Sequence, residues 1–168
     1  MISTGTLPGE VDLQTDASRF WSFLDKPSQP GLLKLIEVWR DRNSNGGFVV
    51  GKDIPSRALS DIMCHLMVWE PIDDGHDLYV RLAGSALHRR YNCDITGKRT
   101  SEIYTSTDQA ILLADFGYVL RTRTPIYRRR QIVKYGVQQA LDGEIGIFPA
   151  LSPDRSATWF LIGLFLSV

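Results

Sequence analysis

The sequence has few residues of the kinds that bind metals or form cross-links. Two cysteines, Cys64 and Cys93, occur among 168 residues, and they form neither a CxxC pair nor the spacing of a zinc site. The three histidines show no HExxH pattern. We therefore expect no metal site and two buried free thiols, which fits a reducing, cytoplasmic compartment.

Long apolar runs and an excess of one charge are also missing. The longest apolar run, Trp159–Val168, has ten residues, and a bilayer crossing needs about twenty. The first twenty residues contain acids and no apolar segment of a secretory signal. Nineteen basic side chains balance nineteen acidic ones, whereas nucleic-acid binding depends on positive charge. We expect neither a membrane nor a nucleic-acid partner.

The remaining composition is that of one folded domain. Apolar residues make up 43% of the chain, and a chain of this length buries roughly two thirds of its unfolded surface. Residues 1–29 are interpreted as an arm with a short helix over Asp16–Leu24, capped by Asp16. Residues 30–168 form the domain itself.

The domain begins with a helix and a hairpin. Pro30 starts the helix, apolar residues recur at helical spacing, and Asn43–Gly47 ends it. Its expected buried face consists of Leu32, Leu35, Ile36 and Trp39. After a short helical piece within Ile54–Ile62, strands are expected over His65–Ile72 and Asp77–Ala83, joined by a turn at Asp74-Gly75.

The second half combines helices with three more strands. A short helix is expected over Ser85–Tyr91, and a longer one begins at a capping box of Ser106 and Gln109 and ends near Thr122. The apolar face of the longer helix would consist of Ile111, Leu112, Phe116, Val119 and Leu120. Strands follow over Ile126–Tyr135, over Gln138–Leu151 with a bulge near Asp142-Gly143, and over Ala157–Val168. The pattern predicts an α+β fold with a five-stranded antiparallel sheet and helices on one face.

Several short segments match, in order, those of one known family. They are Ile54–Arg57, Arg81–Ser85, Tyr91–Gly97, Thr124–Arg128 and Phe148–Ser152. With the order two strands, helical segment, three strands, they make residues 30–168 resemble a bacterial PAS-like family, formerly described as of unknown function. The resemblance implies a PAS-like fold with an N-terminal helical extension. It also implies a sensory domain in signal transduction that binds a small molecule between helices and sheet, or a partner through the outer sheet face and the N-terminal helix, as in a homodimer.

The resemblance and the alternation of large residues together indicate which side chains lie near the expected cavity. They are Trp69, Tyr79, Arg81, Tyr91, Phe116, Tyr118, Phe148 and Phe160. Aromatic residues at alternating positions are also typical of an ordinary core. Arg81 is the most informative, because an inward-pointing guanidinium needs a buried acceptor. Neither ligand nor cofactor can be named.

Two residues bear on cofactors that some PAS domains carry. His88 lies where some haem-binding PAS domains place a ligand, but Arg89 beside it favours an exposed polar helix face. Asn92-Cys93 matches the first two letters of the NCRFLQ segment of flavin photosensors, and the following residues do not continue the match. We therefore assign no cofactor to either residue.

The remaining polar features leave several functions open. Gly84 and Gly97 are interpreted as turn residues with positive φ, since no phosphate-loop pattern surrounds them. A basic stretch is either a solvated sheet edge or a site for anionic partners; it consists of Arg121, Arg123, Arg128, Arg129, Arg130 and Lys134. No GxSxG elbow is present, so we assign no catalytic residue and expect no enzyme. A ligand-free dimerisation or adaptor module is the alternative to a sensor, and a small enzyme on a cone-like α+β fold comes third.

Overall fold

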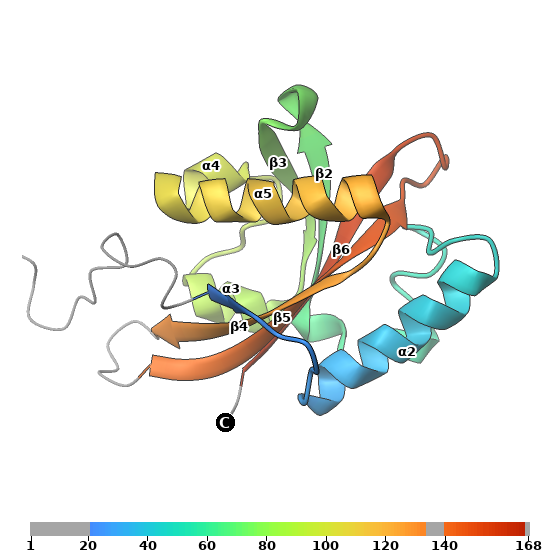
Figure 1. Cartoon of the computed structure of the whole chain (residues 1–168), viewed down its shortest axis with the longest axis horizontal. Helices are drawn as coiled ribbons and strands as arrows, with labels where there is room; N and C mark the ends of the chain where they lie inside the picture. The colour runs from blue at the N-terminus through green and yellow to red at the C-terminus, as the bar shows by residue number, and fades with distance from the viewer. Residues whose placement is uncertain (1–20, 134–139, 167–168) are drawn as a thin grey trace, which may run out of the picture.

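One antiparallel sheet organises the chain. The structure is a computed structural model that describes residues 21–133 and 140–166 (Figure 1). The six strands lie in the order β1-β4-β5-β6-β2-β3. Their bounds are Trp21–Phe23 (β1), Leu66–Ile72 (β2), Asp77–Ala83 (β3), Ile126–Val133 (β4), Ala140–Leu151 (β5) and Thr158–Leu166 (β6). The α-helices are Pro30–Ser44 (α2), Ser85–Tyr91 (α3), Thr100–Ile103 (α4) and Ser106–Thr122 (α5), and three 3-10 turns cover Arg57–Leu59, Met63–His65 and Asp73–Gly75.

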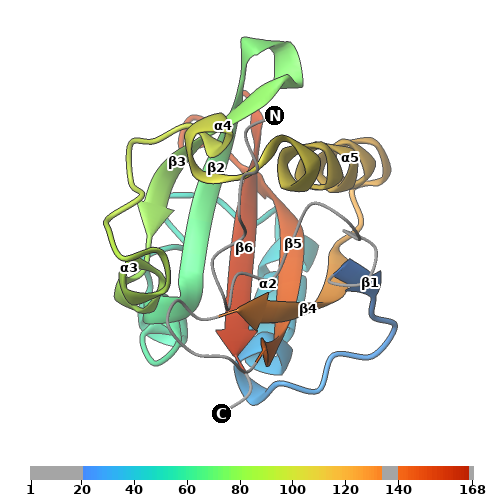
Figure 2. The same cartoon turned by 90° about the vertical axis from the view of Figure 1, so that its left-hand side faces the viewer.

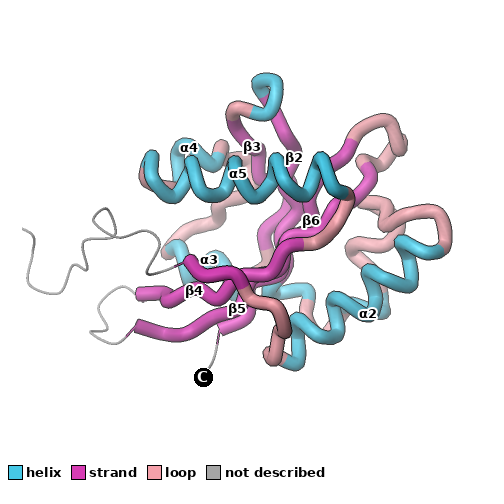
Figure 3. The backbone as a smooth tube through the Cα atoms, viewed as in Figure 1, coloured by secondary structure: helices cyan, strands magenta, loops and turns pink. Residues whose placement is uncertain are grey.

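Helices cover both faces of the sheet, so the prediction that they lie on one face is wrong. Figure 2 shows α2 behind the strands and α3, α4 and α5 in front of them, and Figure 3 shows the same separation. Side chains that alternate along the strands supply two separate cores. In β6, Ile162 belongs to the core under α5, whereas Leu161 belongs to the core under α2.

The sixth strand, β1, replaces the end of a predicted helix. Its three residues pair antiparallel with β4, from Trp21 opposite Arg130 to Phe23 opposite Arg128. Aromatic residues pack well on the pleated surface of a strand, and the edge of β4 offers hydrogen bonds that a helix would leave unmade. The helix over Asp16–Leu24 is therefore wrong for residues 21–23, and residues 16–20 lie outside the described part of the chain.

Helix α2 has the bounds and the buried face that its sequence predicts. Its buried residues are Leu32, Leu35, Ile36 and Trp39. The N-cap Gln29 makes no capping bond with its own side chain. Instead, the buried carboxylate of Glu144 in β5 accepts hydrogen bonds from the amides of Ser28 and Gln29, at 2.9 and 2.8 Å, and from the Ser28 hydroxyl. A side chain from the centre of the sheet thus fixes the start of α2.

Strands β2 and β3 form the predicted hairpin, with an irregularity that the sequence does not predict. Trp69 lies opposite Val80 and Val68 opposite Leu82, so Arg81 has no partner residue in β2. The expected bulge near Asp142-Gly143 is absent, because the register of β5 with β4 runs through both residues without a shift. The irregularity is instead a bulge at Arg81 in β3.

The N-cap of helix α5 lies one residue earlier than the sequence predicts. Thr105, not Ser106, is the N-cap, and its hydroxyl accepts a hydrogen bond from the Asp108 amide at 3.2 Å. Gln109 instead donates its side-chain amide to Asp77 at the start of β3. The predicted end at Thr122 is confirmed. Within the described residues, no helix combines the length and apolar character needed to cross a membrane.

Candidate functional site

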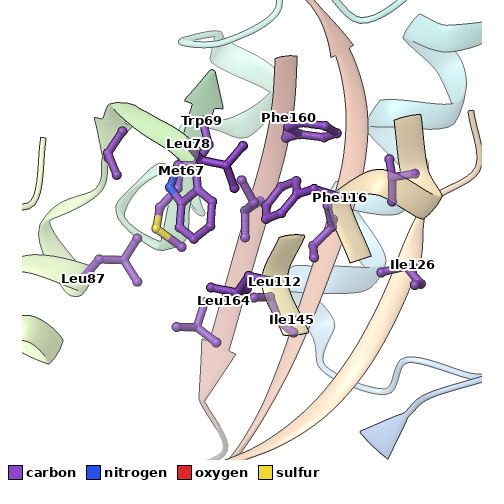
Figure 4. Packing of buried hydrophobic residues seen from close by; sticks show 14 of the residues in the cluster. Met67, Trp69, Leu78, Leu87, Leu112, Phe116, Ile126, Ile145, Phe160 and Leu164 are labelled. Carbon is purple, nitrogen blue, oxygen red and sulfur yellow. The ribbon is translucent and has the colours of Figure 1, made fainter. Parts of the chain in front are cut away.

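Three of the predicted site residues meet in the core between the sheet and α5. Figure 4 shows Trp69 from β2, Phe116 from α5 and Phe160 from β6 lying side by side. The ring centroids of Phe116 are 5.3 Å from Trp69 and 4.4 Å from Phe160. All three side chains are buried. Strand alternation directs Trp69 and Phe160 to the same sheet face, and helical spacing directs Phe116 down onto them.

Two tyrosines extend this aromatic core toward α3. Tyr104, which follows α4, lies 6.0 Å from Trp69 between ring centroids, and Tyr91 at the end of α3 lies 6.0 Å from Tyr104. The hydroxyls of the two tyrosines are 2.5 Å apart and share a hydrogen bond. Both side chains are half-buried. The aromatic core therefore runs continuously from under α5 to the short helices at the β3 edge.

The indole nitrogen of Trp69 has no hydrogen-bond partner in the described part of the chain. The residue is 1% exposed, and its Nε1 lies in the core without an acceptor. In Figure 4 this nitrogen lies on the side of the ring that faces away from Phe116. Gln109 Oε1 is a second buried atom without a partner. Leaving a buried donor unpaired costs about 1–3 kcal/mol.

A polar network centred on Asp77 includes the side-chain amide of Gln109. The buried carboxylate of Asp77 accepts hydrogen bonds from the Thr100 hydroxyl, the Ser101 hydroxyl and the Gln109 amide, at 2.9, 2.5 and 3.1 Å. The Leu78 amide donates a further bond. Burial alone would raise the pKa of Asp77, but the hydrogen bonds from Ser101, Leu78 and Thr100 together outweigh it and lower the pKa below its usual value. Asp77 is therefore an ionised anchor that joins β3, α4 and α5.

Arg81 points to the outer sheet face, away from the aromatic core. Its guanidinium pairs with Glu70 and lies 4.7 Å from the ring centroid of Tyr79 and 5.4 Å from that of Trp159. The reason is strand alternation: Val80 faces the aromatic core, so Tyr79 and Arg81 on either side of it face away. Arg81 and Tyr79 thus form a separate cluster at the surface.

Two further predicted residues also lie outside the aromatic core. Phe148 is buried under α2, with its ring centroid 5.6 Å from Trp39 and 5.9 Å from Tyr127. Tyr118 is 43% exposed on α5. Of the predicted set, the structure therefore brings together Trp69, Tyr91, Phe116 and Phe160.

The residues that connect this core to its surroundings carry no recognisable signal in the sequence. In the sequence, Asp77 looks like an ordinary first residue of a strand, and Gln109 is expected to cap its own helix. Tyr104 ends a helical turn and carries no pattern of its own. Each takes its place only through contacts with segments distant in sequence, such as the bond between Gln109 and Asp77, and no local signal predicts them.

The basic stretch is not a uniformly solvated edge. Arg128 faces α5, and its guanidinium pairs with the buried carboxylate of Asp115 while lying 4.0 Å from the Phe23 ring centroid. Arg129 points to the opposite face and is exposed, and Arg123 ends α5. Lys134 and the side chain of Arg130 lie outside what the structure describes.

The cofactor candidates lie at the surface near α3. His88 Nε2 is 3.0 Å from the Ala83 carbonyl oxygen and 3.1 Å from Asp94 Oδ1. Cys93 is exposed and Cys64 is half-buried, so the prediction of two buried thiols is wrong. Cys93 lies in the turn after α3, where no helix or strand covers it. The described residues contain no group of three potential metal ligands.

Gly97 has the positive φ that its turn predicts, at 84°, whereas Gly84 has a φ of −68°. Gly84 is required for a different reason, because an added Cβ would lie 2.3 Å from the Cys64 carbonyl oxygen. Neither glycine is part of the aromatic core. No model of a known protein family and no curated protein matches this chain.

Proposed function

We propose that the chain is a PAS-like sensory domain of signal transduction, which binds a small molecule in the aromatic core between the sheet and α5. The order of elements supports the proposal: a hairpin (β2, β3), a helical segment (α3 to α5) and three strands (β4 to β6), as the resemblance to the PAS-like family implies. The strand β1 and the helix α2 are then additions to this unit.

The unpartnered indole N–H of Trp69 is the observation that carries the proposal. A ligand with a hydrogen-bond acceptor that reaches Nε1 would remove the cost of the unpaired donor, about 1–3 kcal/mol. The surrounding rings of Tyr104 and Phe116 offer aromatic contacts to a planar ligand. The expected ligand is therefore flat, largely apolar and equipped with one acceptor.

Entry of a ligand would be transmitted through α5. Phe116 would have to move, and it lies on the same helix as Gln109, which is bonded to Asp77, and as Asp115, which is paired with Arg128. Helix α5 is thereby fastened to β3 at one end and to β4 near its middle. A bound ligand would shift α5 only if it bound more tightly to one position of the helix than to another.

Native mass spectrometry of gently purified protein, followed by thermal shift across a metabolite panel, tests this function. We expect a bound mass or a panel compound that raises Tm. The response should be lost in Trp69→Phe, which keeps the aromatic packing and removes the N–H. Trp159→Phe, at the outer face, is the matched control and should keep the response. An apo mass with no Tm change across the panel would count against small-molecule sensing.

A ligand-free interaction module is the second candidate, and the exposure of Phe23 favours it. Phe23 is 68% exposed on the edge strand β1, although a large aromatic ring gains free energy by burial. The Arg128 guanidinium lies 4.0 Å from the centroid of its ring. A second copy of the chain that covers this ring would form a homodimer.

Sedimentation analysis over a range of concentrations tests the second candidate. We expect a dimer that dissociates more readily in Phe23→Ser, with Ser22→Ala on the same strand as the control. A wild-type protein that stays monomeric at high concentration would exclude the homodimer through Phe23.

A further inference from the structure

A hollow of about 330 Å³ lies at one end of the sheet, apart from the aromatic core. Its lining consists of Asn43, Gly46, Gly47, Phe48, Arg123, Pro149, Ala150 and Leu151. It forms because β5 extends beyond β4: Ile126 of β4 pairs with Ile147, and the strand does not continue past it. Residues 148–151 of β5 therefore have no β4 neighbour, and a parallel bridge between Val49 and Leu151 covers only the far end.

The C-terminal ends of α2 and α5 meet at this hollow, on the right-hand side of Figure 1. Free carbonyl groups at a helix C-terminus carry negative partial charge and would repel an anion. At the end of α2, some of the carbonyls accept hydrogen bonds from nearby groups. The Arg42 carbonyl accepts from the amides of Asn45 and Gly47, and the Arg40 carbonyl accepts from the Ser44 hydroxyl.

Near the end of α5, two carbonyls also accept hydrogen bonds. The Val119 carbonyl accepts a hydrogen bond from the Arg123 amide, and the Tyr118 carbonyl accepts one from the Thr122 hydroxyl. Arg123 is the one charged residue among those that line the hollow. The hollow is therefore suited to an anion.

Arg123 occupies a backbone position that usually belongs to glycine. It is the C-cap of α5, with φ 57° and ψ 25°, in the left-handed region that side chains rarely adopt. Its guanidinium donates a hydrogen bond to the Thr158 hydroxyl. No ion pair of Arg123 occurs among the described residues. A guanidinium has five N–H donors, so donors remain for a ligand.

The floor of the hollow is apolar and offers little backbone hydrogen bonding. Phe48 and Ala150 are buried beneath it. Pro149 has no N–H, and its carbonyl already accepts a hydrogen bond from Trp39 Nε1 at 2.8 Å. An extra β-strand therefore cannot pair with this part of β5. A small molecule fits better, since small-molecule sites begin at roughly 300 Å³.

We propose that this hollow binds a small carboxylate with an apolar body. Arg123 donates to the carboxylate, and the apolar body rests on Phe48 and Pro149, which line the hollow together with Asn43. Such a ligand contacts the ends of α2 and α5, which cover opposite faces of the sheet. The site is separate from the Trp69 core, and neither depends on the other.

NMR titration of ¹⁵N-labelled protein tests the site, with phenylacetate as the probe and phenylacetamide as its neutral counterpart. We expect saturable shifts of the Gly46 and Gly47 amides and of Arg123 Nε with phenylacetate, and binding of the amide at least about tenfold weaker, because a charge-assisted hydrogen bond is lost. The variant Arg123→Gly should bind phenylacetate at least about tenfold more weakly. Glycine suits the left-handed position, so its Tm should equal or exceed that of the wild type. Arg121→Ala, an exposed change on the same helix, should leave binding unchanged.

Three results would overturn the proposal. They are the absence of saturable shifts at millimolar phenylacetate, equal binding of phenylacetate and phenylacetamide, and undiminished binding by Arg123→Gly. The Tm of each variant shows that the folded protein is being compared in every case.

Discussion

The guanidinium of Arg128 in β4 binds the carboxylate of Asp115 in α5 through two hydrogen bonds. Nε lies 2.5 Å from Oδ2 and Nη2 lies 2.7 Å from Oδ1. The side chains are 11% and 4% exposed. Two-pronged geometry of this kind fixes orientation as well as distance. The pair therefore fixes how α5 lies over the sheet, where this helix covers the aromatic core.

Removal of one partner of this pair should be strongly destabilising. We expect Asp115→Ala to lower the free energy of unfolding by about 3–5 kcal/mol, because it leaves a largely buried guanidinium without its carboxylate. Urea denaturation of the variant measures the change.

The double variant Asp115→Leu/Arg128→Met separates the cost of an unpaired charge from the worth of the pair. Because no charge is left unpaired, we expect it to be more stable than either single replacement. A double variant less stable than Asp115→Ala would show that the pair itself holds α5 in place.

Gly84 should tolerate no side chain, although its φ is ordinary. A Cβ there would lie 2.3 Å from the Cys64 carbonyl oxygen and 2.5 Å from that of Met63. Because both obstacles are backbone, Gly84→Ala should lower the free energy of unfolding by at least about 2 kcal/mol. Gly75→Ala is the comparison, since it meets nothing within 4 Å and suffers only from a φ of 83°, a cost of about 1 kcal/mol. Equal losses in the two variants would contradict the close approach.

Asp77 should stabilise the fold in a pH-dependent way. Its folded-state pKa is lowered, so its contribution is fully present above the unfolded value, about 3.9, and is lost as pH falls through the lower folded value. Asp77→Asn should therefore cost about 2–3 kcal/mol at pH 7, and progressively less below pH 4. Urea denaturation at several pH values measures this difference, with Asp74→Asn in the exposed turn as the control. A cost for Asp77→Asn that is the same at every pH would contradict an ionised anchor.

Local patterns predicted most elements of this fold. Helical spacing gave the buried face of α2 correctly, since Leu32 and Trp39 need only their own helix to share a side. The β2–β3 hairpin follows from the turn between its strands, and α5 ends at the predicted Thr122. These features depend on neighbours in sequence, which is why the sequence alone predicts them.

The errors concern contacts between distant segments. The strand β1 exists only because β4 offers it an edge, and an isolated segment with Trp21 and Phe23 does not reveal that edge. Helix α2 covers the second face because alternating residues of β5 and β6 are apolar on both sides, as Phe148 and Ile147 are. The bulge at Arg81 depends on where the register of the β2–β3 hairpin shifts. For the site, the sequence predicted the aromatic residues and could not predict which of two faces each one occupies.

The indole N–H resonance of Trp69 is the most direct test of a ligand site at this nitrogen. The chain has four tryptophans, so Trp69→Phe identifies the resonance by its loss from a ¹⁵N spectrum. Quinoline, a flat compound with a ring-nitrogen acceptor, and naphthalene, which has none, are then added to the wild-type protein. We expect a saturable shift of the Trp69 resonance with quinoline that exceeds any shift with naphthalene, and a Tm rise that Trp69→Phe abolishes. A Trp69 resonance that responds to neither compound, or equally to both, would contradict a ligand site at this nitrogen.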